Sequence, residues 1–441
     1  MPTGKNIGRS GVDPSAARPA GGGPLRGLRV IDLGTMLAGP VACTLMADFG
    51  ADVLKIEEPG HGDALRHIGP IVGDESLMWN VEARGKRSIA INLKRAEGRE
   101  AFLKIVETAD AVVENFRPGT LQKLGLDFET LRKANPDIVL LSVSGFGQTG
   151  PLAKRAGYDR IALAFGGLME ITGYPDRPPT KVGVSIADYQ TALFGAFSLM
   201  MALYHRDASG GRGQHIDLAL YESVYRFTDT LTTSYDLLGE VRQRQGNVGF
   251  AGAPGEHFLT RCGRYLILTI SNTAMFRRLA QAMDRPDLAE NPSYLTHELR
   301  WKHVHELNAI VAEWIKENDL THVEQRLDQF GIAYGVTLRI DEICANEHYA
   351  SRQNIQVVRH PRLGPIKMQG VGPKFSETPA PGLQPAPMLG EHTEEILRAA
   401  GMDENQIAAL IASGVARSHP DDCRPRFPDD VRLPHTGHPT L

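Results

Sequence analysis

Short apolar runs alternate with helix-forming segments in the first third of this 441-residue sequence. The runs RVIDL, ADVLKIE, KRSIAINL, DAVVENF and IVLLSVS each have the length of one strand, and amphipathic stretches separate most of them. Parallel strands need crossover segments of this kind, and strands that are apolar throughout are covered on both faces. The alternation therefore predicts an α/β fold built on a doubly wound, Rossmann-like parallel sheet.

Composition along the chain predicts five segments. Residues 1–23 and 417–441 are rich in Gly, Pro, Arg or Asp and poor in large apolar residues, so we expect a disordered leader and a disordered tail. Between them we expect a large Rossmann-like domain at 24–224, a smaller α+β domain at 225–345, and a return to the large domain at 346–416. Within these domains we expect helices at 159–172, 188–206 and 222–238, and a hairpin at 258–270.

Charge and cysteine usage exclude several classes of protein. The 48 Lys and Arg against 52 Asp and Glu give a net charge of −4, which disfavours a nucleic-acid binder. The longest apolar run, 192–204, is shorter than the roughly 20 residues that span a bilayer. Four scattered cysteines and scattered histidines predict neither a disulfide framework nor a metal site. We expect a reducing compartment, with the cytoplasm as the default location.

Two glycine-rich segments have the spacing of nucleotide-binding motifs, but each lacks a feature that its motif needs in order to bind a nucleotide. Gly145, Gly147 and Gly150 have the GxGxxG spacing after a strand, but Pro151 follows at once where a helix should open. The turn GTMLAGPV has P-loop spacing without the lysine and the hydroxyl residue that hold phosphate and magnesium. We therefore expect neither a bound dinucleotide nor ATP.

Basic residues cluster beside the ends of predicted strands, where ligands dock in open α/β sheets. Such a cluster suits a compact polyphosphate, although each of these cations alone is better explained as a solvated surface charge. The residues concerned are Arg84, Lys86, Arg87, Lys94, Arg95, Arg117 and Lys123.

Asp188 opens the strongly apolar helix predicted at 188–206. An aspartate in this place commonly caps the helix by accepting hydrogen bonds from free backbone N–H groups. The helix dipole and those hydrogen bonds would lower its pKa, which predicts a permanently ionised carboxylate in apolar surroundings. Attack on an activated acyl group requires a carboxylate of this kind.

Eight blocks of the sequence together resemble the class III CoA-transferase family. This family includes formyl-CoA, carnitine-CoA and dicarboxylate CoA-transferases and is related to the α-methylacyl-CoA racemases. The resemblance runs in order from about Leu25 to about Val415. The blocks are PLRGLRVIDLGTMLAGPVACTLMADFGADVLKIE, RGKRSIAINLK, DAVVENFRPGTLQKLGLDF, SGFGQTGP, RAGYD, IADYQTALFGA, GRGQHIDLALYES and PMLGEHTEEIL.

The resemblance implies a reaction and a nucleophile. The catalytic aspartate of the family falls on Asp188, which would form a mixed anhydride with the acyl group and then a thioester with CoA. CoA would move from an acyl-CoA, such as succinyl-CoA, to a carboxylic acid, with no permanently bound cofactor and no metal. The family also implies a homodimer of interlocked chains.

The resemblance further implies which residues hold coenzyme A. RGKRSIAINLK resembles the stretch that binds the nucleotide end, and VENFRPGTLQKLG resembles the pantetheine and diphosphate side. The glycine-rich loop 246–255 resembles the family's cover over the active site. The implied CoA ligands are Arg87, Asn92, Lys94, Asn115, Phe116, Arg117 and Lys123.

Two departures narrow the expected chemistry. Leu37 stands near the first turn where formyl-CoA transferases have a glutamine, which disfavours formate and oxalate. Tyr158 stands where the racemases have a histidine base, and the ordinary tyrosine pKa of about 10 suits that role poorly. A racemase or epimerase is thus the alternative activity, and a non-catalytic CoA-binding subunit of a heteromeric transferase is a third possibility.

Overall fold

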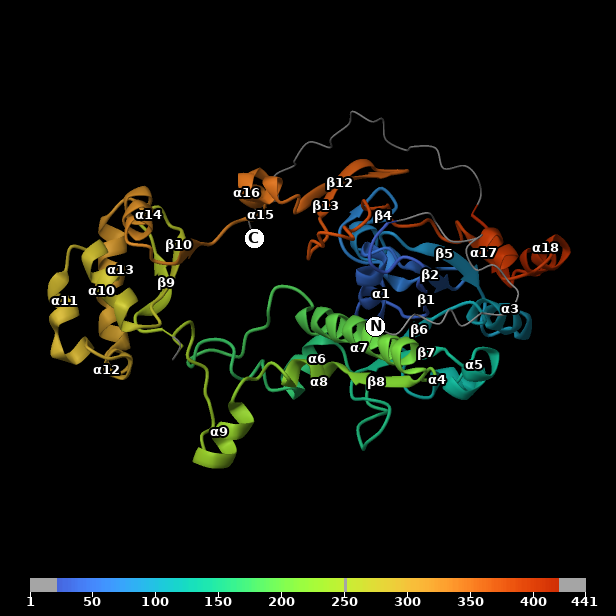
Figure 1. Ribbon diagram of the computed structural model, residues 1–441, viewed down its shortest axis with the longest axis horizontal. Helices are drawn as coiled ribbons and strands as arrows, with labels where there is room; N and C mark the ends of the chain where they lie inside the picture. The colour runs from blue at the N-terminus through green and yellow to red at the C-terminus, as the bar shows by residue number, and fades with distance from the viewer. Residues whose placement is uncertain (1–21, 250–251, 420–441) are drawn as a thin grey trace, which may run out of the picture. The chain divides into compact units, whose positions relative to one another are not determined.

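The computed structural model describes residues 22–249 and 252–419, which form two compact units. The larger unit combines the chain up to residue 166 with residues 182–229 and the segment from residue 351 onward. The smaller unit contains residues 167–181 and 230–350. In Figure 1 the helices α10 to α14 belong to the smaller unit, and the sheet that contains β1 belongs to the larger one. The predicted leader and tail lie almost entirely outside the described residues.

A seven-stranded sheet forms the framework of the larger unit. Its order is β14-β5-β2-β1-β6-β7-β8, and every strand is parallel to its neighbours except β14. The chain reverses its direction of winding between β1 and β6, which confirms the predicted mostly parallel α/β sheet. The strands are β1 (Arg29–Asp32), β2 (Asp52–Glu57), β5 (Arg87–Ile91), β6 (Ala111–Glu114), β7 (Val139–Ser144), β8 (His215–Ala219) and β14 (Ala416–Arg417).

Helices cover both faces of this sheet. The face that carries Ile31, Leu54 and Val112 packs against α3 (Ala96–Val106), α5 (Phe128–Ala134), α17 (Thr393–Ala399) and α18 (Glu404–Ala412) in one apolar core. The opposite face packs against α1 (Ala38–Asp48) and α7 (Ile186–Ser209). A Cβ at Gly195 of α7 would lie 3.0 Å from Leu141 Cδ2, so glycine permits this close approach of helix and strand.

Shorter elements complete the larger unit. They are η1 (Ala64–His67), β3 (Ile71–Val72), β4 (Glu75–Ser76), α2 (Leu77–Glu82), α4 (Thr120–Leu124), α6 (Asp159–Phe165), α8 (Leu220–Tyr225), β12 (Ile355–His360) and β13 (Gly364–Gln369). No helix opens at the glycines 145–150, as the sequence predicts, because the chain forms turns until α6 begins.

The smaller unit has its own core around an antiparallel sheet of order β11-β10-β9. Strands β9 (Gly255–Leu259) and β10 (Tyr265–Thr269) form the predicted hairpin, and Gly263 turns the chain with a φ of +81°. The remaining elements are α9 (Leu231–Leu238), α10 (Thr273–Ala282), α11 (Pro286–Glu290), η2 (Pro292–Tyr294), α12 (His297–Lys302), α13 (Val304–Glu317), α14 (Leu320–Gln329), β11 (Tyr334–Val336), α15 (Ile340–Ala345) and α16 (Glu347–Ser351).

Two predicted helices were wrong in extent. The helix expected at 222–238 is divided into α8 and α9, and Asp229 between them has a left-handed φ of 56° that no helix continues through. The helix expected at 159–172 ends at Phe165. Helix α7 is longer than expected, and by length and apolar composition it could cross a membrane, although it packs against α1, β7 and β8.

Candidate active site

Asp188 lies in the first turn of α7 and does not cap the helix, in contrast to the prediction. The N-cap is Ser185, whose side chain caps nothing. The buried carboxylate of Asp159, at the start of α6, instead accepts a hydrogen bond of 2.8 Å from the Ala187 N–H. The Asp159 carboxylate therefore accepts a backbone N–H at the start of the helix, and the Asp188 carboxyl is not needed for that contact.

The predicted low pKa of Asp188 is also wrong. Burial raises the pKa of this carboxyl from 3.8 to about 7, and the nearby negative charge of Asp159 adds to the increase. The helix dipole is not strong enough to offset the loss of hydration. At neutral pH the side chain exchanges between the carboxylic acid and the carboxylate, and desolvation makes the ionised form a stronger nucleophile than an exposed aspartate.

A second contact anchors the turn that carries Asp188. The Tyr189 hydroxyl donates a hydrogen bond of 2.7 Å to Glu82 Oε1 at the end of α2. Burial and the Glu82 carboxylate raise the pKa of Tyr189, so the phenol keeps its proton. The backbone carbonyl of Glu82 in turn accepts a hydrogen bond from Thr44 Oγ1 of α1. The start of α7 is thus tied to two neighbouring helices.

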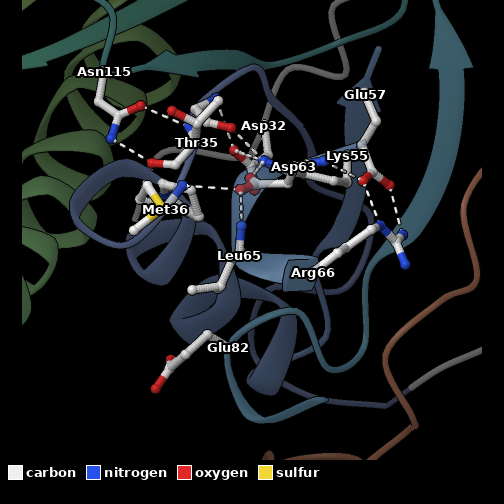
Figure 2. Close-up of polar contacts among 12 residues, drawn as sticks. Asp32, Thr35, Met36, Lys55, Glu57, Asp63, Leu65, Arg66, Glu82 and Asn115 are labelled. Carbon is white, nitrogen blue, oxygen red and sulfur yellow. Dashed lines mark hydrogen bonds and ion pairs between the residues drawn. The ribbon is translucent and has the colours of Figure 1, made fainter. Parts of the chain in front are cut away.

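The turn that follows β1 lies at the switch point of the sheet, next to the loop that follows β6. The Thr35 N–H donates to Asn115 Oδ1, and Asn115 Nδ2 donates to the Thr35 carbonyl, each at 2.7 Å (Figure 2). Leu37, at the end of this turn, belongs to one buried cluster with Ala192 of α7, and Tyr189 packs against that cluster. The turn therefore adjoins the part of α7 that carries Asp188.

The structure places the predicted CoA ligands at different parts of the sheet. Asn92, Lys94, Asn115 and Phe116 follow the carboxyl ends of β5 and β6, the edge at which α7 begins. Lys123 lies on α4, and the side chains of Lys94 and Lys123 are exposed. Asn92 Oδ1 accepts the Lys94 N–H at 3.0 Å, so this asparagine orders its own turn.

Arg87 differs from the other predicted ligands because it begins β5 and its guanidinium forms internal ion pairs. Its nitrogens lie 3.1 Å from Asp52 Oδ1 and 2.8 Å from Glu395 Oε1. It lines a cavity of about 730 Å³ together with residues at the amino ends of β2 and β5. Arg84 and Lys86 of the same block pair with the buried carboxylates of Asp48 and Asp32. Arg84, Lys86 and Arg87 therefore all form ion pairs within the protein.

Arg117 lines a second cavity that the sequence did not predict, about 310 Å³ in volume. Glu114, Ser142 and His215 also line it, from three adjacent strands and on the face opposite to α1 and α7. The Ser142 hydroxyl lies 2.9 Å from His215 Nε2. Burial raises the pKa of Glu114 to about 7, despite hydrogen bonds from Ser142 and the Phe116 N–H.

Tyr158, at the position where the racemases have a histidine, precedes α6 and is exposed. The glycine-rich loop 246–255 lies only partly within the described residues, since 250–251 fall outside them. In the described part, Gly246 lies against Tyr174, where a Cβ would meet the ring at 2.7 Å. Among the described residues, no three His, Cys, Asp or Glu side chains are arranged to hold a metal ion.

A buried ionic network under the first turn was missed from the sequence. Lys55 Nζ lies 2.9 Å from Asp63 Oδ2 and 3.5 Å from Asp32 Oδ1, and it also donates to the Gly34 carbonyl (Figure 2). All three donors of this ammonium group are therefore used. The signal was Lys55 between Leu54 and Ile56 in a predicted buried strand, because a buried lysine requires carboxylate partners.

The chain is similar to known proteins in sequence and in fold. The sequence model described as CoA-transferase family III matches residues 25–393. Succinyl-CoA–D-citramalate CoA-transferase of Chloroflexus aurantiacus is 40% identical over 394 residues, which cover 89% of this chain and 98% of that protein. Succinyl-CoA:glutarate CoA-transferase of Homo sapiens is 32% identical over 398 residues and 90% of each chain. The crystal structure of a CAIB/BAIF family protein from Brucella suis matches with a TM-score of 0.76 and 32% identity, covering 86% of this chain and 100% of that one.

Proposed function

The chain belongs to CoA-transferase family III, and on this basis we propose that it moves CoA from succinyl-CoA to a dicarboxylic acid, with Asp188 as the nucleophile. The two relatives described above are named for succinyl-CoA as the donor, and for citramalate and glutarate as the acceptors. Both acceptors carry two carboxylates, and both relatives align over about nine-tenths of this chain. The donor and the class of acceptor are carried over to this chain from them.

The proposed reaction has four balanced steps. The Asp188 carboxylate attacks the thioester carbonyl, the C–S bond breaks, and CoA leaves as a thiolate from an aspartyl–acyl anhydride. The thiolate attacks the Asp188 carbonyl and releases the donor acid, which leaves an aspartyl-CoA thioester. The acceptor carboxylate displaces the thiolate to form a second anhydride. The thiolate then attacks the acceptor carbonyl, which yields the new acyl-CoA and regenerates the Asp188 carboxylate.

The observation that carries the proposal is the environment of Asp188. Its carboxyl is half-buried in the first turn of α7, at the sheet edge to which ligands bind in open α/β folds. Burial and Asp159 keep its pKa near the pH at which it must act. Lys94 and Arg117 follow strands at the same edge, Lys123 lies on α4 just after β6, and these three exposed cations are our candidates for binding the phosphates of CoA.

We further propose that the enzyme is a homodimer whose chains interlock. Four apolar residues spaced along one side of α7, Leu193, Phe197, Met201 and Tyr204, are each at least half exposed. In the smaller unit, α9 has no buried residue, and its Leu237 and Leu238 are also exposed. Exposed apolar side chains that gather on one helix often mark a protein–protein contact. Those on α7 and α9 therefore support the proposal that a second copy of the chain covers them.

The test is CoA exchange in the purified enzyme. Succinyl-CoA is incubated with a panel of free acids, including citramalate, glutarate, formate and acetate, and new thioesters are measured. We expect transfer to dicarboxylic acids without ATP, and loss of at least about 10³-fold in rate for Asp188→Asn, which keeps the shape of the side chain. Transfer at the wild-type rate by Asp188→Asn would contradict the proposal.

A further inference from the structure

The turn Thr35–Leu37 contains a strained residue that must be held in place. Met36 has a φ of 65°, in the left-handed region that residues with a side chain rarely adopt. Its N–H donates a hydrogen bond of 3.1 Å to Asp63 Oδ1, from a loop 27 residues farther along the chain (Figure 2). A strained conformation persists only where the surroundings impose it, and Asp63 supplies that constraint here.

Asp63 is itself fixed from three sides. The same Oδ1 accepts the Leu65 N–H at 2.9 Å, and Oδ2 lies 2.9 Å from Lys55 Nζ. The backbone N–H of Asp63 donates to Glu57 Oε2 at 3.0 Å. Burial favours the neutral acid, but the Lys55 ammonium and the two N–H donors outweigh it and lower the pKa of Asp63. Asp63 is thus a rigid, charged acceptor.

A second chain of contacts holds Asp63 to the ends of the central strands. Glu57, the last residue of β2, forms a two-point ion pair with Arg66, with distances of 2.7 and 2.8 Å, and accepts the Ser88 hydroxyl of β5 at 2.6 Å. Arg66 stacks over the Trp79 ring at 3.8 Å. The Met36 backbone is therefore tied to the ends of β2 and β5 through the carboxylate of Asp63.

The turn Thr35–Leu37 lies beside the part of α7 that carries Asp188, the proposed nucleophile. It lies at the switch point of the sheet, Thr35 is exposed and Met36 is half-buried, and Leu37 packs in one cluster with Ala192 of α7. We propose that Asp63 is a positioning residue of the CoA-transferase reaction, which fixes the turn Thr35–Leu37 as a preformed wall against which the acyl-CoA binds. The inference rests on the proposed function for the identity of that ligand.

The test measures binding without turnover. Isothermal calorimetry with coenzyme A should give a Kd about tenfold higher for Asp63→Ala than for the wild type, because the turn must then be ordered by the ligand. The KM for succinyl-CoA should rise by a similar factor while kcat changes less than about threefold. Asp110→Asn is the matched control, since this buried carboxylate pairs with Arg206 and lies just before β6, at the amino ends of the strands. It should leave both constants unchanged.

A double-mutant cycle separates positioning from general destabilisation. Glycine adopts a positive φ without strain, so in a Met36→Gly background the effect of Asp63→Ala on Kd should fall to less than about threefold. A purely structural role would give the same loss in both backgrounds. If Asp63→Ala does not fold, Asp63→Asn keeps the shape and removes the charge opposite Lys55, and it should still raise Kd at least about threefold.

The outcomes for the inference and for the proposed function are distinct. Wild-type Kd values in both Asp63 variants would overturn the positioning role, whether or not CoA is transferred. A wild-type enzyme that binds CoA and transfers none would overturn the proposed function and leave the role of Asp63 in binding to be judged from Kd alone.

Discussion

At the start of α7 one aspartate, Asp159, accepts a backbone N–H of the helix, and another, Asp188, provides the proposed reactive carboxylate. Asp159 accepts the Ala187 N–H, whereas Asp188, the residue after Ala187, accepts no backbone hydrogen bond from the part of the chain that the structure describes. Desolvation therefore dominates and raises its pKa to about 7. A poorly hydrated carboxylate loses less hydration energy than a fully hydrated one when it forms a neutral anhydride or thioester. This environment therefore suits a covalent role.

The raised pKa predicts an acid limb in the activity profile. Only the ionised Asp188 attacks, so kcat/KM should level off above about pH 8, reach half of that value at about pH 7, and approach a tenfold fall per pH unit at lower pH. In Asp159→Asn the amide still accepts the Ala187 N–H but the like charge is gone, so the pKa of Asp188 decreases and the limb should move to lower pH. The measurement is kcat/KM for succinyl-CoA between pH 5 and 9.

The control for this profile is Asp207→Asn, which removes a charge from the last turns of the same helix and should leave the limb unmoved. A limb near pH 4 in the wild type, or one that Asp159→Asn does not shift, would contradict the assignment of the limb to Asp188.

Single residues were the least predictable part of the site. Asp188 could be singled out because it stands in an apolar helix, but the direction of its pKa shift depended on the depth of burial and on Asp159, which is 29 positions away in sequence. Arg87 shows the same limit. Its block is basic in sequence, whereas Asp52 and Glu395, which engage it, come from distant parts of the chain.

Helix α7 is held at its start by a hydrogen bond to α2, and this contact gives a prediction at the scale of elements. Tyr189→Phe leaves the buried Glu82 carboxylate without its 2.7 Å donor, which should cost about 1–3 kcal/mol of the free energy of unfolding. Because the same turn carries Asp188, kcat should also fall. Chemical denaturation and steady-state kinetics measure the two effects.

Tyr265→Phe is the control, since Tyr265 is on β10 of the smaller unit and is 49% exposed. It should leave the free energy of unfolding and kcat unchanged. Equal stability of Tyr189→Phe and the wild type would show that the contact with Glu82 does not anchor the helix.

Strands that are buried in the sheet could be predicted from their apolar runs. Helix boundaries that depend on the backbone conformation of one residue were harder to predict. Strands β1, β2, β5, β6 and β7 are buried on both faces, because helices cover both, and their mostly apolar runs are therefore visible in sequence. The division of 222–238 into α8 and α9 depends on the left-handed Asp229, and no strong breaker such as proline marks that position. Met36 is likewise left-handed without being glycine, because Asp63 holds it.

At the scale of the whole molecule, the exposed stripe on α7 predicts an assembly. Leu193 and Phe197 are each 60% exposed, and replacing both with glutamate would place two charges in the proposed contact between subunits. We expect the wild type to have the mass of a dimer in light scattering and Leu193→Glu/Phe197→Glu to have that of a monomer. Lys133→Glu on α5, on the other side of the sheet, should remain dimeric. A monomeric wild type would contradict the interlocked arrangement.

The central claim is that Asp188 becomes covalently linked to CoA during turnover, and trapping of that thioester tests it most directly. The enzyme is incubated with succinyl-CoA, quenched with hydroxylamine, digested and examined by mass spectrometry. We predict a hydroxamate at Asp188 that requires succinyl-CoA and is absent from Asp188→Asn. Full transfer activity with an unmodified Asp188, or a hydroxamate on another carboxylate alone, would contradict the account.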